Sequence, residues 1–150
     1  MRLNRAIGSI LVSSLLVIMT ACEIDTRLQV EEENPPAFSM FGSGSLGCLR
    51  VRGPKQQRQV DGEARYIYWE ILPEKGFSHG TAVNALSPII YGKVPPGYIQ
   101  TYPENGEAPP LIEGEKYAVW AQTVSANGAI KYFVIQDGKA VEVQEKNSPL

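Results

Sequence analysis

The stretch Leu111–Val124, LIEGEKYAVWAQTV, decides how the rest of the chain is interpreted. It combines a turn with a long β-strand, and side chains alternate between the two faces of a strand. One face therefore carries Tyr117, Val119 and Ala121. The opposite face carries Ala118, Trp120 and Gln122. We expect a central strand with Tyr117 buried in the core.

Short strand signals separated by turns continue on both sides of this stretch. Eleven prolines and fourteen glycines in 150 residues favour a β-rich fold, and no helical period follows Cys22. About eight short strands are typical of a single antiparallel β-sandwich, which we place at residues 26–144, before a polar tail at 145–150. Besides the central strand, we expect strands at Thr26–Val30, Ala37–Phe41, Leu46–Arg52, Ala64–Leu72, Pro88–Lys93, Tyr98–Tyr102, Ala129–Ile135 and Lys139–Val143. Phe77–Val83 is expected to be an irregular loop.

The segment Ala64–Leu72 is the most β-prone part of the chain. A large aromatic ring between two isoleucines buries the most area, so we assign its tryptophan face to the core. That face carries Ile67, Trp69 and Ile71. The solvent face is then expected to carry Tyr66, Tyr68 and Glu70. In Leu46–Arg52 the same alternation directs Leu49 and Val51 inward and the two arginines outward.

The spacing of Leu111, Gly114, Tyr117 and Val119 resembles the corner before strand F of fibronectin type III and immunoglobulin-like sandwiches. In those folds a tyrosine hydroxyl bonds back to the backbone of the corner and connects the two sheets. The resemblance covers residues 111–135 best. It implies an immunoglobulin-like sandwich, and it implies no activity. With the N-terminal segment that ends in Met19-Thr20-Ala21-Cys22, the whole pattern looks like uncharacterised bacterial lipoproteins.

Residues 1–21 have the anatomy of a cleaved signal peptide, with Arg2 and Arg5 before a short apolar run. The run ends in Met19-Thr20-Ala21-Cys22, which resembles the lipobox of bacterial lipoproteins. The resemblance implies acylation of Cys22 and a short lipidated tether at residues 22–25. An ordinary secretory signal and an uncleaved anchor helix are the alternatives.

The charge of the chain bears on where it acts. Removal of residues 1–21 leaves twelve basic against sixteen acidic residues, and no basic excess suggests nucleic acid. This acidic body does not favour docking on anionic lipid, so acyl chains would supply the anchor. Glu23 departs from the aspartate of an inner-membrane retention signal. We therefore expect a lipid-anchored protein of the bacterial envelope. We favour the outer membrane, on the side facing the periplasm, over the inner membrane.

Few residues offer catalytic or metal-binding chemistry. Lipidation of Cys22 leaves Cys48 without a partner in the chain, as a free thiol or an intermolecular one. His79 is the single histidine, and it is expected in an exposed loop. Neither a histidine- or cysteine-based metal site nor a cofactor is expected. Paired carboxylates have no short sequence signature, so an Asp/Glu-dependent hydrolase stays a weak alternative.

Three aromatic residues are the candidate ligand-binding residues. We expect Tyr66, Tyr68 and Trp120 on outer faces of the sandwich, where rings can stack on sugars or dock a protein. Packing under loops or across strands is the competing interpretation. The predicted function is a non-enzymatic binding or assembly module for an envelope protein, with a carbohydrate-binding module for cell-wall or surface glycan as the alternative.

Overall fold

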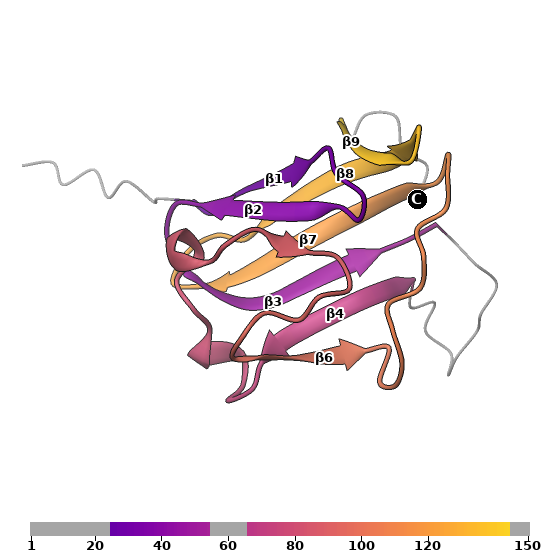
Figure 1. Cartoon of the computed structure of the whole chain (residues 1–150). Helices are drawn as coiled ribbons and strands as arrows, with labels where there is room; N and C mark the ends of the chain where they lie inside the picture. The colour runs from indigo at the N-terminus through magenta and orange to yellow at the C-terminus, as the bar shows by residue number, and fades with distance from the viewer. Residues whose placement is uncertain (1–24, 55–65, 145–150) are drawn as a thin grey trace, which may run out of the picture.

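The fold contains nine strands and two short 3-10 helices in the residues described, 25–54 and 66–144 of a computed structural model (Figure 1). The strands are β1 (Arg27–Glu31), β2 (Ala37–Phe41), β3 (Ser45–Arg52), β4 (Ile67–Pro73), β5 (Ile89–Ile90), β6 (Tyr98–Tyr102), β7 (Lys116–Val124), β8 (Ala129–Gln136) and β9 (Lys139–Val143). The 3-10 helices are η1 (Phe77–His79) and η2 (Val83–Ala85).

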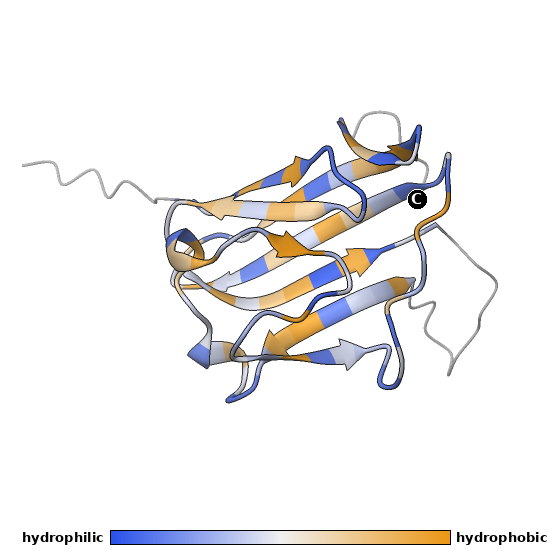
Figure 2. Cartoon of the chain, viewed as in Figure 1, coloured by the Kyte–Doolittle hydropathy of each residue, from blue (hydrophilic) through white to orange (hydrophobic). Residues whose placement is uncertain are grey.

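Two antiparallel sheets lie face to face, which confirms the predicted all-β sandwich. The small sheet has the order β1-β2-β5, and the large sheet has the order β6-β4-β3-β7-β8-β9. Figure 1 shows β1 and β2 lying across the large sheet. Along the strands, apolar and polar residues alternate, as the colours of Figure 2 show. This alternation lets one face of each sheet meet the other while the second face stays in contact with water.

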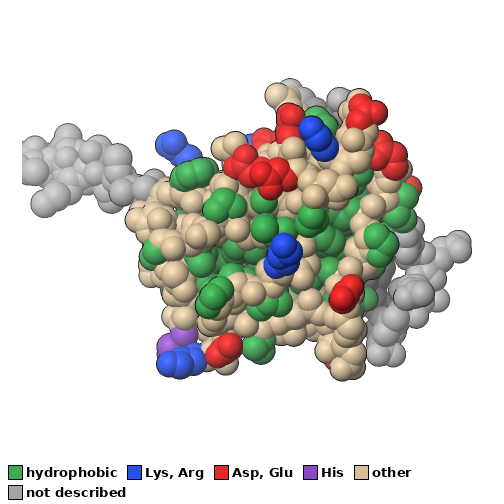
Figure 3. Space-filling model, in the orientation of Figure 1, with side chains coloured by type: hydrophobic (Ala, Val, Ile, Leu, Met, Phe, Trp, Pro, Cys, Tyr) green, Lys and Arg blue, Asp and Glu red, His purple; other side chains and the backbone are tan. Residues whose placement is uncertain are grey.

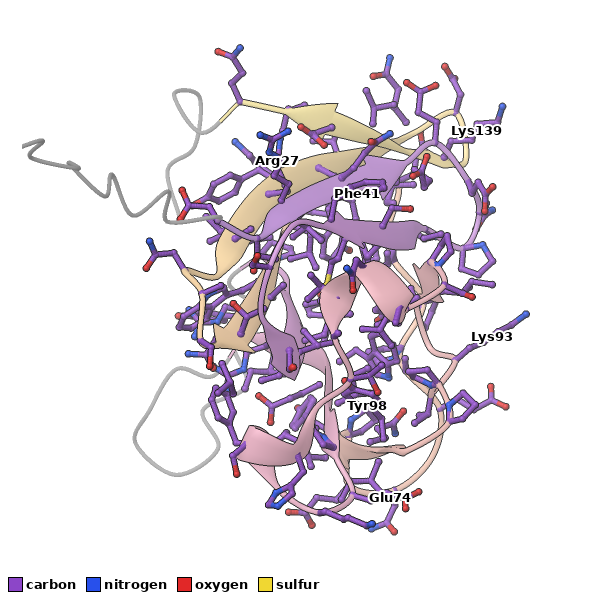
Figure 4. The ribbon with its side chains drawn as sticks, turned by 90° about the vertical axis from the view of Figure 1, so that its left-hand side faces the viewer. Arg27, Phe41, Glu74, Lys93, Tyr98 and Lys139 are labelled. Atoms are coloured by element: carbon purple, nitrogen blue, oxygen red, sulfur yellow. The ribbon has the colours of Figure 1, made fainter. Side chains whose placement is uncertain are left out.

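The core fills the space between the two sheets. The largest side chains with less than 2% exposure are Trp69, Tyr117, Phe38, Phe133, Leu46, Leu49 and Ile71. Burying a side chain of this size stabilises the fold by roughly 1.5–3 kcal/mol. Tyr98 also lies between the layers, whereas Lys93 and Lys139 point away from the body (Figure 4). The Tyr98 hydroxyl donates to the Leu46 carbonyl oxygen at 3.0 Å.

The predicted tyrosine corner is present. Tyr117 is fully buried, and its hydroxyl oxygen accepts a hydrogen bond from the backbone N–H of Ile112 at 2.9 Å. Gly114, in the turn between them, has a φ of 79°, a conformation that glycine adopts at low cost. The spacing read from the sequence therefore reports a real backbone constraint at this corner.

The prediction that Tyr68 faces solvent is wrong. Val51 pairs with Trp69, but the next residue, Arg52, pairs with Ile67, so Tyr68 is the extra residue of a β-bulge. The bulge reverses the alternation at the start of β4, and Tyr68 turns into the core with 8% exposure. Ile67 instead shares a side with the exposed Arg52, which also corrects its predicted place in the core.

The predicted strand Pro88–Lys93 is much shorter than expected. Only Ile89 and Ile90 pair with β2. The chain then turns, because Gly92 takes a φ of 78° and the Lys93 N–H donates to the Ile90 carbonyl at 2.9 Å. The expected irregular loop Phe77–Val83 contains η1 and the start of η2.

Several predictions fall outside the described residues. These are the signal peptide at 1–21, the acylation of Cys22, residues 22–24 of the tether at 22–25, residues 64 and 65 of the predicted strand Ala64–Leu72, and the polar tail at 145–150. In the ranges 25–54 and 66–144, no helix is long and apolar enough to cross a membrane.

Candidate ligand-binding cleft

A cleft of about 420 Å³ opens at the end of the sandwich where β4 begins and β6 ends. Tyrosine, proline and isoleucine side chains make up most of its wall, and Asn105 and Glu107 are its amide and carboxylate groups. The lining residues are Pro54, Tyr66, Ile67, Tyr68, Tyr102, Pro103, Asn105, Glu107, Pro109, Pro110 and Ile112. Two of the three aromatic residues singled out in the sequence therefore lie in one cleft.

The bulge in β4 places the tyrosines of the cleft. Tyr66 precedes the strand, and its carbonyl accepts a hydrogen bond from the Gly53 N–H at 2.8 Å. The ring of Tyr68 lies against Gly53, where an added Cβ would be 1.9 Å from the ring atom Cε2. A side chain at position 53 would therefore displace Tyr68. The absence of a side chain at Gly53 gives this ring its place between the cleft and the core.

Tyr68 also connects the cleft to the corner. Its ring meets the Tyr117 ring edge-on, with centroids 5.2 Å apart, a favoured aromatic geometry. The Tyr68 hydroxyl is buried and has no hydrogen-bond partner within the described residues. Burial raises the pKa of Tyr68, and it raises the pKa of Tyr117 to about 12. Both phenols are therefore protonated at neutral pH.

The other wall of the cleft is the loop that connects β6 to β7. Although it has no regular secondary structure, core side chains hold its backbone at several points. The Tyr91 hydroxyl donates to the Pro109 carbonyl at 2.8 Å, and Tyr117 accepts from Ile112. The Gln100 side-chain amide donates to the carbonyls of Pro103 and Gly106 at 2.8 and 3.0 Å. These bonds hold the cleft wall in one conformation before any ligand arrives.

A second hollow, of about 600 Å³, lies on the other side of the same loop. It shares Glu107 and Pro110 with the cleft, and its lining includes Lys93, Glu113 and Tyr91. Glu113 is already engaged, because its carboxylate accepts from the Asp137 and Gly138 N–H groups at 2.7 and 3.1 Å. This second hollow is lined by one aromatic ring, that of Tyr91, whereas the cleft is lined by three. We therefore place the candidate site in the cleft.

Trp120 lies apart from the cleft, on the face of the large sheet that points away from the small sheet. It sits opposite Arg50 in the register of β3 and β7. The guanidinium carbons of Arg50 and Arg52 lie 5.8 and 5.4 Å from the centre of its ring. Such cation–π contacts occupy part of the ring surface that a sugar would need. The structure therefore does not bring Trp120 together with Tyr66 and Tyr68.

Cys48 belongs to a polar network on the same sheet face. The carboxylate of Glu70 forms an ion pair with Arg50, accepts from the Thr101 hydroxyl at 2.8 Å, and lies 3.8 Å from the Cys48 sulfur. Burial, with the nearby Glu70 charge, raises the pKa of Cys48 to about 12. A thiol in this state is a poor nucleophile.

His79 is exposed in η1, and its ring nitrogen Nδ1 lies 3.2 Å from the Ser78 hydroxyl. No cluster of three or more His, Cys, Asp or Glu residues that could hold a metal ion is found among residues 25–54 and 66–144.

Sequence reasoning missed most of the cleft. Tyr102 is 38% exposed, and together with Pro103, Pro109 and Pro110 it supplies the open part of the wall. A signal was present, since Tyr-Pro and Pro-Pro flank an Asn-Gly turn within ten residues.

Comparison with known proteins finds no family model, no curated protein and no solved structure that matches this chain.

Proposed function

We propose that this chain is a lipid-anchored, non-enzymatic binding module of a bacterial cell envelope. The tyrosine–proline cleft is its ligand site. The observation that carries the proposal is a preformed cleft whose loop wall is fixed by the buried hydroxyls of Tyr91 and Tyr117. Fixing a wall in advance lowers the entropic cost of binding. The signal anatomy ending at Cys22 supports the anchor, and the tyrosine corner supports a fibronectin type III or immunoglobulin-like kinship.

The position of the cleft relative to the tether fits this function. The Thr26 N–H donates to the Asn127 carbonyl at 3.1 Å, so the chain enters the domain beside the turn between β7 and β8. The cleft lies at the opposite end of β7, a strand of nine residues that spans roughly 30 Å. An anchored domain would therefore hold its cleft away from the point of lipid attachment.

A glycan is the second candidate ligand. Its support is the combination of half-buried Tyr66 and exposed Tyr102 with Asn105 and Glu107 on the same wall. Sugar rings stack on aromatic faces while their hydroxyls bond to amides and carboxylates. Aromatic-lined grooves also dock extended, proline-rich protein segments, so a protein ligand fits the same tyrosines. Binding assays with both ligand classes decide between them.

The first experiment tests the anchor. Metabolic labelling with a fatty acid is expected to mark the full chain and not its Cys22→Ala variant. Equal labelling of the two would remove the lipid anchor from the proposal. The result is independent of what the cleft binds.

The second experiment tests the cleft with the chain from residue 22 onward carrying Cys22→Ser, which contains the whole hydrophobic core. Binding is measured to purified cell-wall glycan and to proteins of an envelope extract. Tyr102→Ala and Tyr66→Ala are each expected to weaken binding about tenfold, as for a contact worth roughly 1.4 kcal/mol. Phe41→Ala, which removes a more exposed aromatic ring in β2 outside the cleft, is the control. Unchanged binding by both tyrosine variants would refute the cleft assignment.

A further inference from the structure

The face of the large sheet that points away from the small sheet is the second surface with a distinct composition. We call it the outer face and define it by Arg50 and Arg52 of β3, Lys116 and Trp120 of β7, and Ile130 and Tyr132 of β8. The core residues Tyr117, Val119 and Phe133 alternate with them along the same strands. The outer face therefore mixes cations, aromatic rings and an aliphatic side chain.

Strand pairing brings these side chains together. Trp120 pairs with Arg50 on one side and with Ile130 on the other, and Ile130 is 48% exposed. The Lys116 ammonium lies 5.5 Å from the centre of the Tyr132 ring. Each ring of the outer face thus carries a cation beside it, and the cations are held close to apolar surface.

The charge of the outer face is opposite to that of the rest of the domain. The described residues include eight Lys and Arg against twelve Asp and Glu. Strands β3, β4, β7 and β8 direct three cations to the outer face, namely Arg50, Arg52 and Lys116. They direct one acidic residue there, Glu70, and it forms an ion pair with Arg50. The remaining described residues hold five cations against eleven acids. On the side seen in Figure 3, acidic side chains gather along the upper edge.

The tether enters the domain at one end of this face. Besides the Thr26 bond to Asn127, the Asn127 side-chain amide donates to the Asp25 carboxylate at 2.9 Å. Asn127 lies in the turn between β7 and β8, the strands that carry Trp120 and Ile130. Cys22 is four residues before Thr26, and four extended residues reach about 14 Å at most.

We propose that the outer face lies on the headgroups of anionic phospholipids. Lysine and arginine near a bilayer are attracted to anionic headgroups, and tryptophan and tyrosine favour the boundary between headgroups and acyl chains. A partner for this face must be anionic and accept apolar side chains, and the surface of an anionic bilayer is both. The location at a membrane rests on the proposed function, whereas the affinity of the face for lipid does not. The acidic net charge of the chain obscured this surface, because the charge is unevenly distributed.

The test uses the chain from residue 22 onward with Cys22→Ser, so that acyl chains play no part. Co-sedimentation is measured with vesicles of phosphatidylcholine alone and with vesicles that also contain phosphatidylglycerol. We expect binding to the anionic vesicles only, and weaker binding as salt is raised. Equal binding to both vesicles, or none to either, would overturn the proposal. Neither outcome bears on ligand binding at the cleft or on fatty-acid labelling.

Matched variants identify the surface. The double variant Arg52→Gln with Lys116→Gln is expected to weaken vesicle binding about fivefold for each charge removed. Lys75→Gln with Lys93→Gln removes two cations elsewhere and is expected to change binding little. Because Arg52 also contacts Trp120, Lys116→Gln and Ile130→Ser are measured separately with their melting temperatures. If the Lys75→Gln, Lys93→Gln variant loses as much vesicle binding as the Arg52→Gln, Lys116→Gln variant, the assignment of the outer face is wrong. Binding of the wild type to a soluble polyanion, without binding to vesicles, would also contradict the proposal.

Discussion

Replacement of Tyr117 by phenylalanine removes one oxygen atom from a fully buried side chain. The backbone N–H of Ile112 then loses the acceptor that lies 2.9 Å away. A buried donor left unsatisfied costs about 1–3 kcal/mol. Ile112 is 45% exposed, so water can reach part of this site, and we expect a cost in the lower range, about 1–2 kcal/mol. In a domain of this size that loss lowers the melting temperature by roughly 3–8 °C.

Thermal and urea unfolding of the wild type and Tyr117→Phe measure this effect. The dependence of unfolding free energy on urea should stay unchanged, because the same surface is exposed. Hydrogen exchange adds a local readout, since the Ile112 amide should exchange faster in the variant. Tyr102→Phe, which removes a hydroxyl from an exposed tyrosine of the cleft, is the control. If Tyr117→Phe melts with the wild type and the Ile112 amide keeps its protection, the corner hydrogen bond does not stabilise the fold.

Three further predictions concern buried groups. Tyr68→Phe is expected to keep or raise the melting temperature, because it removes a buried hydroxyl without a described partner; a clear loss of stability would reveal a partner. Alkylation of Cys48 by iodoacetamide at pH 8 should be about a thousandfold slower in the folded protein than in urea, since burial raises its pKa from 9.0 to about 12; equal rates would show an accessible thiolate. Unfolding free energy should be constant from neutral pH to about pH 8 and fall above it, measured by urea titration. The reason is that the unfolded chain loses protons from Cys48 and Tyr117 before the folded one, whose pKa values are raised; stability that rises with alkaline pH would contradict this.

The parts of the fold that sequence could predict are those governed by local spacing. The corner was predictable because Leu111, Gly114 and Tyr117 lie within seven residues. Together they form the turn that brings the Ile112 N–H to the Tyr117 hydroxyl. The strands β2, β6 and β9 lie at the predicted residues, since turn signals bound them closely. Inward-facing Leu49 and Val51 follow from simple alternation in β3.

The parts that sequence could not predict depend on contacts between distant residues. The bulge at Tyr68 requires the empty space at Gly53, the residue that follows the neighbouring strand β3. A period-two reading of β4 has no means of detecting it and placed Tyr68 on the wrong side. The cleft joins Tyr66 to Tyr102, residues whose proximity arises from the pairing of β4 with β6. The anchoring of Pro109 by Tyr91 likewise follows only from the packed fold.

The side-chain hydrogen bonds that hold the β6–β7 loop in place affect how the ligand preference of the cleft could change. Every hydrogen bond that Gln100, Tyr91 and Tyr117 make to this loop is to a backbone carbonyl or N–H. None of them depends on which side chain the loop residue carries. The path of the loop is therefore held through its backbone, and the exposed side chains at positions 104, 105 and 107 take no part in these bonds. Ligand preference in such a domain could be reprogrammed by substitution at positions 104, 105 and 107, as in a grafted recognition loop, without redesigning the core.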